Sequence, residues 1–250
     1  MIMRASRLIG FAVIVAAFTA ACRVTEAPPR AEETVPDSAP PTVVLEPDPQ
    51  PPPALIAEST VPKIEVFRRP GSARPVRHFK HPSEYGFPRV FLVKEDTGDW
   101  LRVYLPMEPN ESTGWVRARD VSLTTTGYRI LVDTSRNHLT VFDGDRVLVR
   151  ETVAVGTGGT PTPTGHFYIT MLVEPPDPGG AYGPYAYGLS AYSEVLNTFA
   201  GGDGQVAIHG TNDPSSIGQD ASHGCIRMDN RVITRLTRFL PLGTPVDIRA

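Results

Sequence analysis

The placement of proline constrains this chain more than any other feature. The 250-residue sequence contains 26 prolines, and residues 26–62 read "EAPPRAEETVPDSAPPTVVLEPDPQPPPALIAESTVP". Proline fixes φ and removes a backbone donor, and this tract has no aromatic side chains around which a core could form. We therefore expect a semi-extended linker over residues 23–62, with folded domains after it.

Residues 1–22 are typical of an export signal. Arg4 and Arg7 precede an apolar run at residues 8–18, which is shorter than the roughly 20 residues that a membrane-spanning helix needs. The run ends in "TAAC", which resembles a bacterial lipoprotein signal in which the cysteine is lipidated. We expect an extracytoplasmic cell-envelope protein, anchored to the membrane by a lipid on Cys22. The alternative is an ordinary secretory signal in which Cys22 is incidental or removed.

Charge and cysteine content narrow the possible partners. The formal net charge is −3 with acidic and basic residues mixed, so no clustered basic face predicts a nucleic-acid partner. The sequence has 2 cysteines, and loss or lipidation of Cys22 leaves Cys225 as the single free thiol. Exported proteins normally pair their thiols, so an unpaired cysteine indicates either an inert buried residue or a reactive one.

Short strands dominate residues 63–124. "KIEVF", "RVFLVKEDTGDWLRVYL" and "GWVRARDVSL" combine apolar positions with Gly and Asp turns. About 60 residues with this pattern suit a small β-barrel. The "GWV" step before a last short strand resembles bacterial SH3-like domains, which bind wall or peptide material or position a neighbouring domain.

Residues 127–250 predict a second, mainly β domain. "YRILVD", "HLTVF", "RVLVRETVAVG", "GHFYITML", "QVAIHG" and "PVDIR" are strand candidates, and Asp143-Gly144 predicts a tight hairpin turn. "NRVITRLTRFL" is the only strong helix pattern, with Asp229 as its N-cap, and it would pack on a sheet as a support. The long stretch at residues 174–204 contains several tyrosines, and we expect it to form a lid or cleft wall beside Cys225. The alternative is a short buried strand around residues 188–192 between two ordinary loops, and the two interpretations are compatible in part.

The segment "ASHGCIRMDN" gives the free thiol a chemical setting. If the segment is extended, His223, Cys225 and Arg227 share one face, and Ile226 and Met228 point into the core. Nearby cations lower a thiol pKa, and a histidine within reach can deprotonate the thiol and later protonate a leaving group. Amides at or near Cys225 could stabilise an oxyanion.

Two other readings of Cys225 remain open from spacing alone. The first is a small buried apolar residue, although its polar neighbours disfavour this. The second is a zinc site formed by His209, His223 and Cys225, whose spacing fits no common zinc pattern.

The stretch "IHGTNDPSSIGQDASHGCIRM" is very similar to the signature of the L,D-transpeptidases, the cysteine acyltransferases of bacterial peptidoglycan. "TPTPTGHFYI" and "GPYAYGLSAY" also resemble that family. The resemblance implies an antiparallel β-sandwich with a supporting helix, Cys225 as nucleophile, and His209 as general base oriented by the Gly210 carbonyl. It implies that His223 shapes the oxyanion side and substrate contact. The other matched positions are Ser222, Gly224 and Arg227, the last being placed to hold a substrate carboxylate or support the site.

The substrate implied by the resemblance is a peptidoglycan tetrapeptide stem. Cys225 would attack the carbonyl of the third residue and release the terminal D-Ala, and an amine of a neighbouring stem would accept the acyl group to form a 3→3 cross-link. Water as acceptor would make the protein an L,D-carboxypeptidase. A further alternative is a wall-binding lipoprotein with weak catalytic activity. No metal or cofactor is implied, a monomer is expected, and carbapenem β-lactams should acylate the thiol.

Overall fold

The computed structural model describes residues 52–198 and 202–250. The predicted signal, Cys22 and residues 23–51 of the predicted linker lie outside this part. All of the described residues belong to one compact unit, which contains every strand and helix named below. Within the described ranges, no helix has the length and apolar character needed to span a bilayer.

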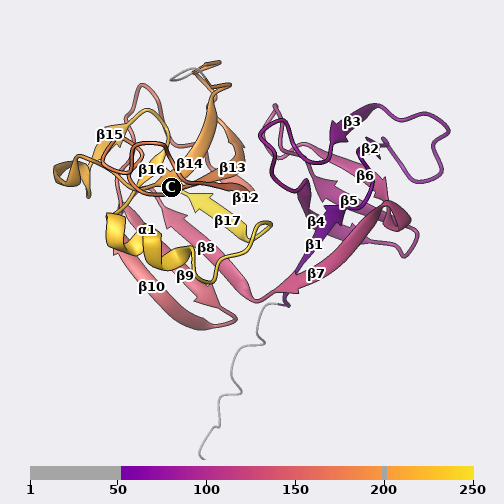
Figure 1. Ribbon diagram of the computed structural model, residues 1–250, viewed down its shortest axis with the longest axis horizontal. Helices are drawn as coiled ribbons and strands as arrows, with labels where there is room; N and C mark the ends of the chain where they lie inside the picture. Colours follow the sequence, from indigo (N-terminus) through magenta and orange to yellow (C-terminus); the bar gives the residue numbers. More distant parts are fainter. Residues whose placement is uncertain (1–51, 199–201) are drawn as a thin grey trace, which may run out of the picture. The chain divides into compact units, whose positions relative to one another are not determined.

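The N-terminal half of the described chain is built from short strands. They form a five-stranded sheet in the order β6-β5-β4-β1-β7 and a separate hairpin of β2 and β3 (Figure 1). The elements are β1 Ala54–Ser59, β2 Lys63–Val66, β3 Arg77–Lys80, β4 Val90–Asp96, β5 Trp100–Tyr104, β6 Thr113–Arg117, the 3-10 turn η1 Ala118–Asp120 and β7 Val121–Thr126. One apolar core joins the hairpin to the sheet, because Ile64 and Val66 of β2 pack with Leu101 and Val116. We refer to residues 54–126 as the N-terminal β-domain; its likeness to SH3-like domains stays a prediction.

The predicted linker boundary at residue 62 is wrong. Ala54–Ser59 forms β1, which pairs with β4 on one side and with β7 on the other, with Ile56 opposite Leu92. The sequence did not predict this strand, because the linker was assigned from the proline content of the whole tract and the apolar stretch within it is short. Its central position in the sheet means that the domain begins near residue 54 and not at residue 63.

The C-terminal half contains an eight-stranded sheet in the order β10-β9-β8-β17-β12-β13-β14-β16. Its strands are β8 Tyr128–Asp133, β9 His138–Asp143, β10 Arg146–Thr152, β12 Gly165–Val173, β13 Ala186–Tyr192, β14 Gln205–His209, β16 Ile226–Arg227 and β17 Pro245–Arg249. Two short strands, β11 Val155–Gly156 and β15 Asp220–Ser222, pair separately, and η2 spans Pro214–Ser216. The mainly β prediction is confirmed. The pairing is not wholly antiparallel, because β8 with β17 and β14 with β16 run parallel.

Helix α1, Asn230–Leu236, is the predicted support. The Asp229 carboxylate accepts a hydrogen bond from the Arg231 N–H at 2.8 Å, which satisfies one of the donors left free at a helix start. Ile233 and Leu236 are fully buried in the main core, as their spacing predicted. The regular helix ends at Leu236, earlier than the apolar pattern indicated, because the chain continues in turns toward Pro241.

Specific contacts join the N-terminal β-domain to the large sheet. Ile56 packs in a cluster with Val90, Leu92 and the fully buried Tyr168 of β12. The Asn110 side-chain amide donates to the Tyr192 carbonyl at 2.8 Å, and its oxygen accepts from the Tyr192 N–H at 2.9 Å. This pair of hydrogen bonds fixes one loop of the domain to the end of β13.

We predict that β1 is a structural strand on which stability depends. Ile56→Ala should lower the free energy of unfolding by about 2–5 kcal/mol, because it opens a cavity beside Tyr168. Glu58→Ala, an exposed change in the same strand, is the control and should cost less than about 0.5 kcal/mol. Denaturant unfolding measures both. Equal small losses in the two variants would place Ile56 outside the cooperative core.

Candidate active site

The short parallel pairing of β14 with β16 creates the candidate site. Ile208 lies opposite Ile226 and His209 lies opposite Arg227, and the Met228 N–H donates to the His209 carbonyl at 2.9 Å. Residues 210–225 form the crossover that returns the chain to the same edge. The predicted strand-end histidine is therefore brought beside the predicted thiol.

A pocket with a cavity of about 140 Å³ collects the residues predicted from the motif. Its lining residues are Ala181, Tyr182, His209, Ser222, His223, Cys225 and Arg227. A cavity of this size is smaller than most drug-sized ligand sites, so it fits one small group of a larger substrate.

The expectation of a continuous extended segment around Cys225 is wrong. β15 ends at Ser222 and β16 begins at Ile226, and between them Gly224 has a φ of +112°. The Ser222 hydroxyl donates to the Cys225 carbonyl at 2.5 Å and accepts from the Gly224 N–H at 3.1 Å. The segment is therefore a tight turn closed by Ser222, and its conformation requires glycine at position 224.

The burial and the pocket position predicted for residues of this turn are both observed. Ile226 and Met228 are fully buried, as predicted for the face opposite the thiol. His223, Cys225 and Arg227 all line the pocket, although the turn and not strand alternation places them there. His223 is exposed to solvent, so it contributes to the outer part of the pocket.

His209 is held in one tautomer by its neighbour. The side chain is 4% exposed, and its Nδ1 lies 2.5 Å from the Gly210 carbonyl oxygen. A carbonyl can only accept, so Nδ1 carries the hydrogen and Nε2 is left with a lone pair. Burial lowers the pKa of His209 to about 4, and the positive charge of Arg227 adds to this effect against the Gly210 hydrogen bond.

Cys225 does not have the lowered pKa that its cationic neighbours suggested. Burial raises the pKa of the thiol above its ordinary value, and the Ala207 backbone N–H and the charge of Arg227 only partly oppose this. The side chain is nevertheless half-buried and not sealed off. At neutral pH the resting site therefore holds a neutral thiol beside a neutral imidazole.

Tyr182 connects the predicted cleft wall to the site. Its ring centroid lies 4.9 Å from that of His209 at an interplanar angle of 59°. Burial raises the pKa of Tyr182, and the charge of a Cys225 thiolate raises it further. The stretch at residues 174–204 thus contributes a wall to the pocket, while its middle part forms β13.

Asn230 was missed by the sequence argument. Its side-chain oxygen accepts from the Thr211 N–H at 2.8 Å, and its amide donates to the Thr211 carbonyl at 3.0 Å. It thereby fixes the main chain directly after the Gly210 carbonyl that orients His209. A Cβ on Gly210 would lie 2.2 Å from the Asn230 side-chain oxygen, so the close approach requires glycine there. A polar residue at the start of a helix carries no sequence signal for this role.

The zinc alternative receives no support from the geometry. Among the residues that the structure describes, no three His, Cys, Asp or Glu side chains are grouped so that they could hold a metal ion. His209, His223 and Cys225 line the same pocket, but their side chains are not grouped as the ligands of one metal ion would be.

Residues 127–248 match the family described as YkuD, L,D-transpeptidase catalytic domain. A relative named YkuD from Bacillus licheniformis is 40% identical over 124 residues, which is 50% of this chain and 67% of the relative. A relative named YqjB from Bacillus subtilis is 32% identical over 128 residues, 47% of this chain and 68% of the relative.

The structure of Bd1075 from Bdellovibrio bacteriovorus is 26% identical with a TM-score of 0.39, and the match covers 50% of this chain. An L,D-transpeptidase from Mycobacterium smegmatis is 17% identical with a TM-score of 0.41, covering 64% of this chain and 90% of the other. The match spans about half, 48%, of the length of the Bd1075 chain.

Together, the matched catalytic-domain family and the sequence relatives define an acyltransferase domain of the L,D-transpeptidase type. The chain belongs to the YkuD family of L,D-transpeptidases.

The buried histidine predicts a specific loss of stability in acid. The unfolded chain takes up this proton near pH 6.5, whereas folded His209 resists protonation until about pH 4. The stabilisation is therefore complete above pH 6.5 and is lost as the pH falls toward 4. The difference of about 2.5 pKa units corresponds to about 3 kcal/mol. Denaturant unfolding between pH 7 and 4 should show this loss, and His209→Gln should reduce it.

His138→Gln is the matched control, because His138 is an exposed histidine of β9. It should keep the wild-type dependence of unfolding free energy on pH. An undiminished loss in His209→Gln would mean that His209 is not held neutral.

Proposed function

We propose that this protein is a peptidoglycan L,D-transpeptidase with Cys225 as its nucleophile and His209 as its general base. The observation that carries the proposal is the shared pocket of a half-buried thiol and a buried imidazole, the latter with its Nδ1 hydrogen committed to the Gly210 carbonyl. Only Nε2 remains to accept a proton, so the imidazole is prepared for a base role before any substrate binds.

In the first step His209 takes the thiol proton as sulfur attacks the carbonyl of the third stem residue. Because the pKa values favour a neutral resting pair, deprotonation accompanies attack and no ion pair is stored beforehand. The new C–S bond forms, the C–N bond to the terminal D-Ala breaks, and the imidazolium returns its proton to the leaving nitrogen. The product is a thioester on Cys225.

In the second step an amine of a neighbouring stem attacks the thioester. His209 removes the amine proton, a C–N bond forms, the C–S bond breaks, and the sulfur regains a proton. The result is a 3→3 cross-link. If water attacks instead, the same site acts as an L,D-carboxypeptidase.

The remaining pocket residues support these steps. The Gly224 N–H already donates a hydrogen bond to the Ser222 hydroxyl, so we assign oxyanion stabilisation to the Cys225 N–H. We assign to His223, which lines the outer part of the pocket, the shaping of the oxyanion side and contact with the substrate. Arg227 is tied by its main chain to Ala154, with N···O distances of 2.9 and 2.8 Å, which leaves its guanidinium to attract a substrate carboxylate. Its charge also favours the thiolate as that form develops.

The same proposal fixes where the protein works. Stem peptides lie outside the cytoplasm, which agrees with the predicted export signal at residues 1–22. A lipid on Cys22 and a linker beginning at residue 23 would hold the enzyme at the membrane while the folded part reaches the wall.

The function can be tested with a purified tetrapeptide stem, with and without an acceptor amine. Mass spectrometry should detect released D-Ala, a covalent acyl group on Cys225, and cross-linked product when the amine is present. Cys225→Ser should lose the acyl-enzyme, and His209→Gln should slow its formation by roughly 100- to 10,000-fold. A carbapenem should add to Cys225 once per chain.

The controls separate the alternatives. His138→Gln should acylate at the wild-type rate, and chelation with EDTA should leave acylation unchanged, because proton transfer by His209 needs no Lewis acid. Loss of acylation with EDTA would restore the zinc alternative. A wild-type chain that binds wall material but never forms the thioester would favour the wall-binding lipoprotein.

Asn230 should act as a positioning residue for His209. Asn230→Ala releases the main chain at Thr211 and with it the Gly210 carbonyl, so kcat should fall roughly 10- to 100-fold with little change in KM. The Gly210 hydrogen bond raises the pKa of His209, so weakening it should move the acidic limb of the pH–rate profile to lower pH.

Arg231→Ala, at the exposed neighbouring helix position, is the control and should keep the wild-type profile. If Asn230→Ala lowers thermal stability and activity together while the pH profile stays in place, Asn230 is merely structural.

A further inference from the structure

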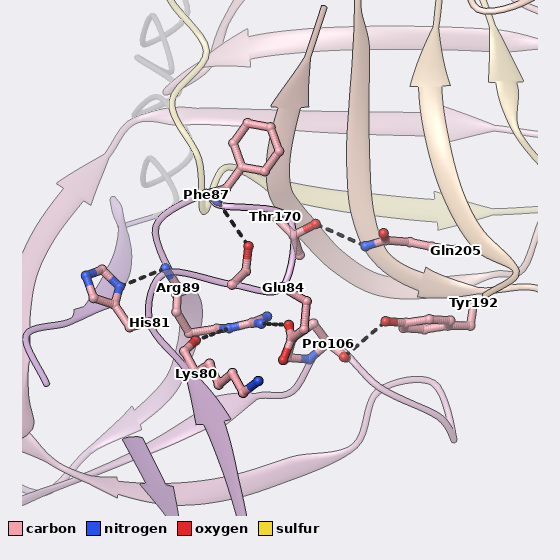
Figure 2. A network of polar contacts seen from close by, with 10 residues as sticks. Lys80, His81, Glu84, Phe87, Arg89, Pro106, Thr170, Tyr192 and Gln205 are labelled. Atoms are coloured by element: carbon pink, nitrogen blue, oxygen red, sulfur yellow. Dashed lines mark hydrogen bonds and ion pairs between the residues drawn. The ribbon is translucent and has the colours of Figure 1, made fainter. Parts of the chain in front are cut away.

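A second cavity lies between the N-terminal β-domain and the large sheet. It has a volume of about 300 Å³, at the lower end of the range for small-molecule sites. Its lining residues from the N-terminal β-domain are Arg77, His78, Phe79, Ser83, Glu84, Tyr85, Arg89, Pro106 and Met107, and those from the sheet are Thr170, Met171, Tyr192, Asp203 and Gln205. Figure 2 shows the polar contacts around it, where the loop that carries Glu84 and Arg89 faces Tyr192 and Gln205.

The walls of this cavity are fixed by hydrogen bonds. Arg89, which is 9% exposed, donates to the Lys80 carbonyl at 3.2 Å and forms an ion pair with Glu84 at 2.7 Å. On the opposite side, the Tyr192 hydroxyl donates to the Pro106 carbonyl at 3.2 Å, and the Gln205 amide donates to Thr170 at 3.1 Å. The cavity is thus formed before any ligand arrives.

The polar groups of the lining that have no partner within the described protein suit an uncharged ligand rich in hydroxyl groups. Arg77 and Arg89 balance Glu84 and Asp203, so the lining carries no formal net charge that would select an ion. In the described part of the chain neither the Arg77 guanidinium nor the Asp203 carboxylate has a hydrogen-bond or ion-pair partner. One can donate to a hydroxyl and the other can accept from it.

Tyr85 adds an apolar platform to these polar groups. The residue is 56% exposed, unlike the core tyrosines, and it lies close enough to Asp203 for that carboxylate to raise its pKa. An exposed aromatic ring beside a donor and an acceptor can stack on the C–H face of a sugar while the polar groups bind its hydroxyls.

The position of the cavity relative to the thiol supports the same class of ligand. Gln205, Ala207 and His209 project to one face of β14, because Val206 and Ile208 between them are buried in the core. Gln205 lines the second cavity, the Ala207 N–H bonds to the Cys225 sulfur, and His209 lines the reactive pocket. Four residue steps of a strand span about 13 Å.

We infer that this second cavity binds the sugar of the glycan strand to which the donor stem peptide is attached. The inference rests on the proposed function. In such a donor, three amino-acid residues separate the sugar-bound end of the stem from the carbonyl that Cys225 attacks, which is an extended length of about 10 Å. With the acyl group that joins stem and sugar, this length matches the spacing between the two cavities along β14.

The test compares two donors on the full chain, a free tetrapeptide stem and the same stem attached to its disaccharide. The wild-type protein should prefer the disaccharide donor by roughly tenfold in kcat/KM, the effect of one well-packed aromatic contact. Tyr85→Ala and Asp203→Asn should bring this ratio close to one. Val147→Ala, an exposed change on edge strand β10, is the control and should keep the wild-type ratio.

A β-1,4-linked N-acetylglucosamine tetrasaccharide, titrated calorimetrically into the same proteins, provides an independent reading. It should bind to the wild type and to Val147→Ala, and more weakly to the two cavity variants. A wild-type ratio of one, or a ratio that the cavity variants keep, would overturn the inference while leaving the transpeptidase intact. If neither donor acylates the protein, the proposed function is rejected instead. The tetrasaccharide titration would then show by itself whether the cavity binds sugar.

Discussion

The two-residue parallel pairing of β14 with β16 is the constraint on which the rest of the site depends. It places residues 16 positions apart in the chain, His209 and Cys225, at one sheet edge, and the fully buried Ile208 and Ile226 hold the pairing from the core side. Parallel neighbours require a crossover, and here residues 210–225 supply the Gly210 carbonyl, the Ser222 turn and His223. The same connection that the sheet requires therefore carries the site.

Burial has opposite consequences for stability and chemistry in this pocket. It lowers the pKa of His209 and raises that of Cys225, so both groups are uncharged at neutral pH and neither stabilises the fold by an ion pair. In the proposed reaction, however, His209 accepts a proton during attack, and a neutral imidazole with one free nitrogen is the starting form that this step requires. Arg227 supplies positive charge close to the thiol, and its effect increases only when negative charge develops there.

The sequence was informative where function depends on residue type and spacing. It located His209, Cys225 and Arg227 through a motif, and the buried partners Ile226 and Met228 through alternation. It could not show that Gly224 breaks the strand, because one glycine in an apolar pattern is compatible with either conformation. Asn230 and β1 were missed for a related reason: hydrogen bonds to a distant loop and pairing between β4 and β7 are tertiary facts without a local pattern.

The contacts of the N-terminal β-domain bear on the choice between an enzyme and a wall-binding protein. Asn110 binds the main chain of Tyr192 at the end of β13, and Tyr168 of β12 is buried against Ile56. In the sheet, β12 pairs with β13 and β13 pairs with β14, the strand that ends at His209. A ligand held between the domain and this sheet is thus held at a fixed distance from the thiol. Wall binding and catalysis then need not be separate functions, since recognition of the glycan by one domain would set the register of the stem peptide in the other.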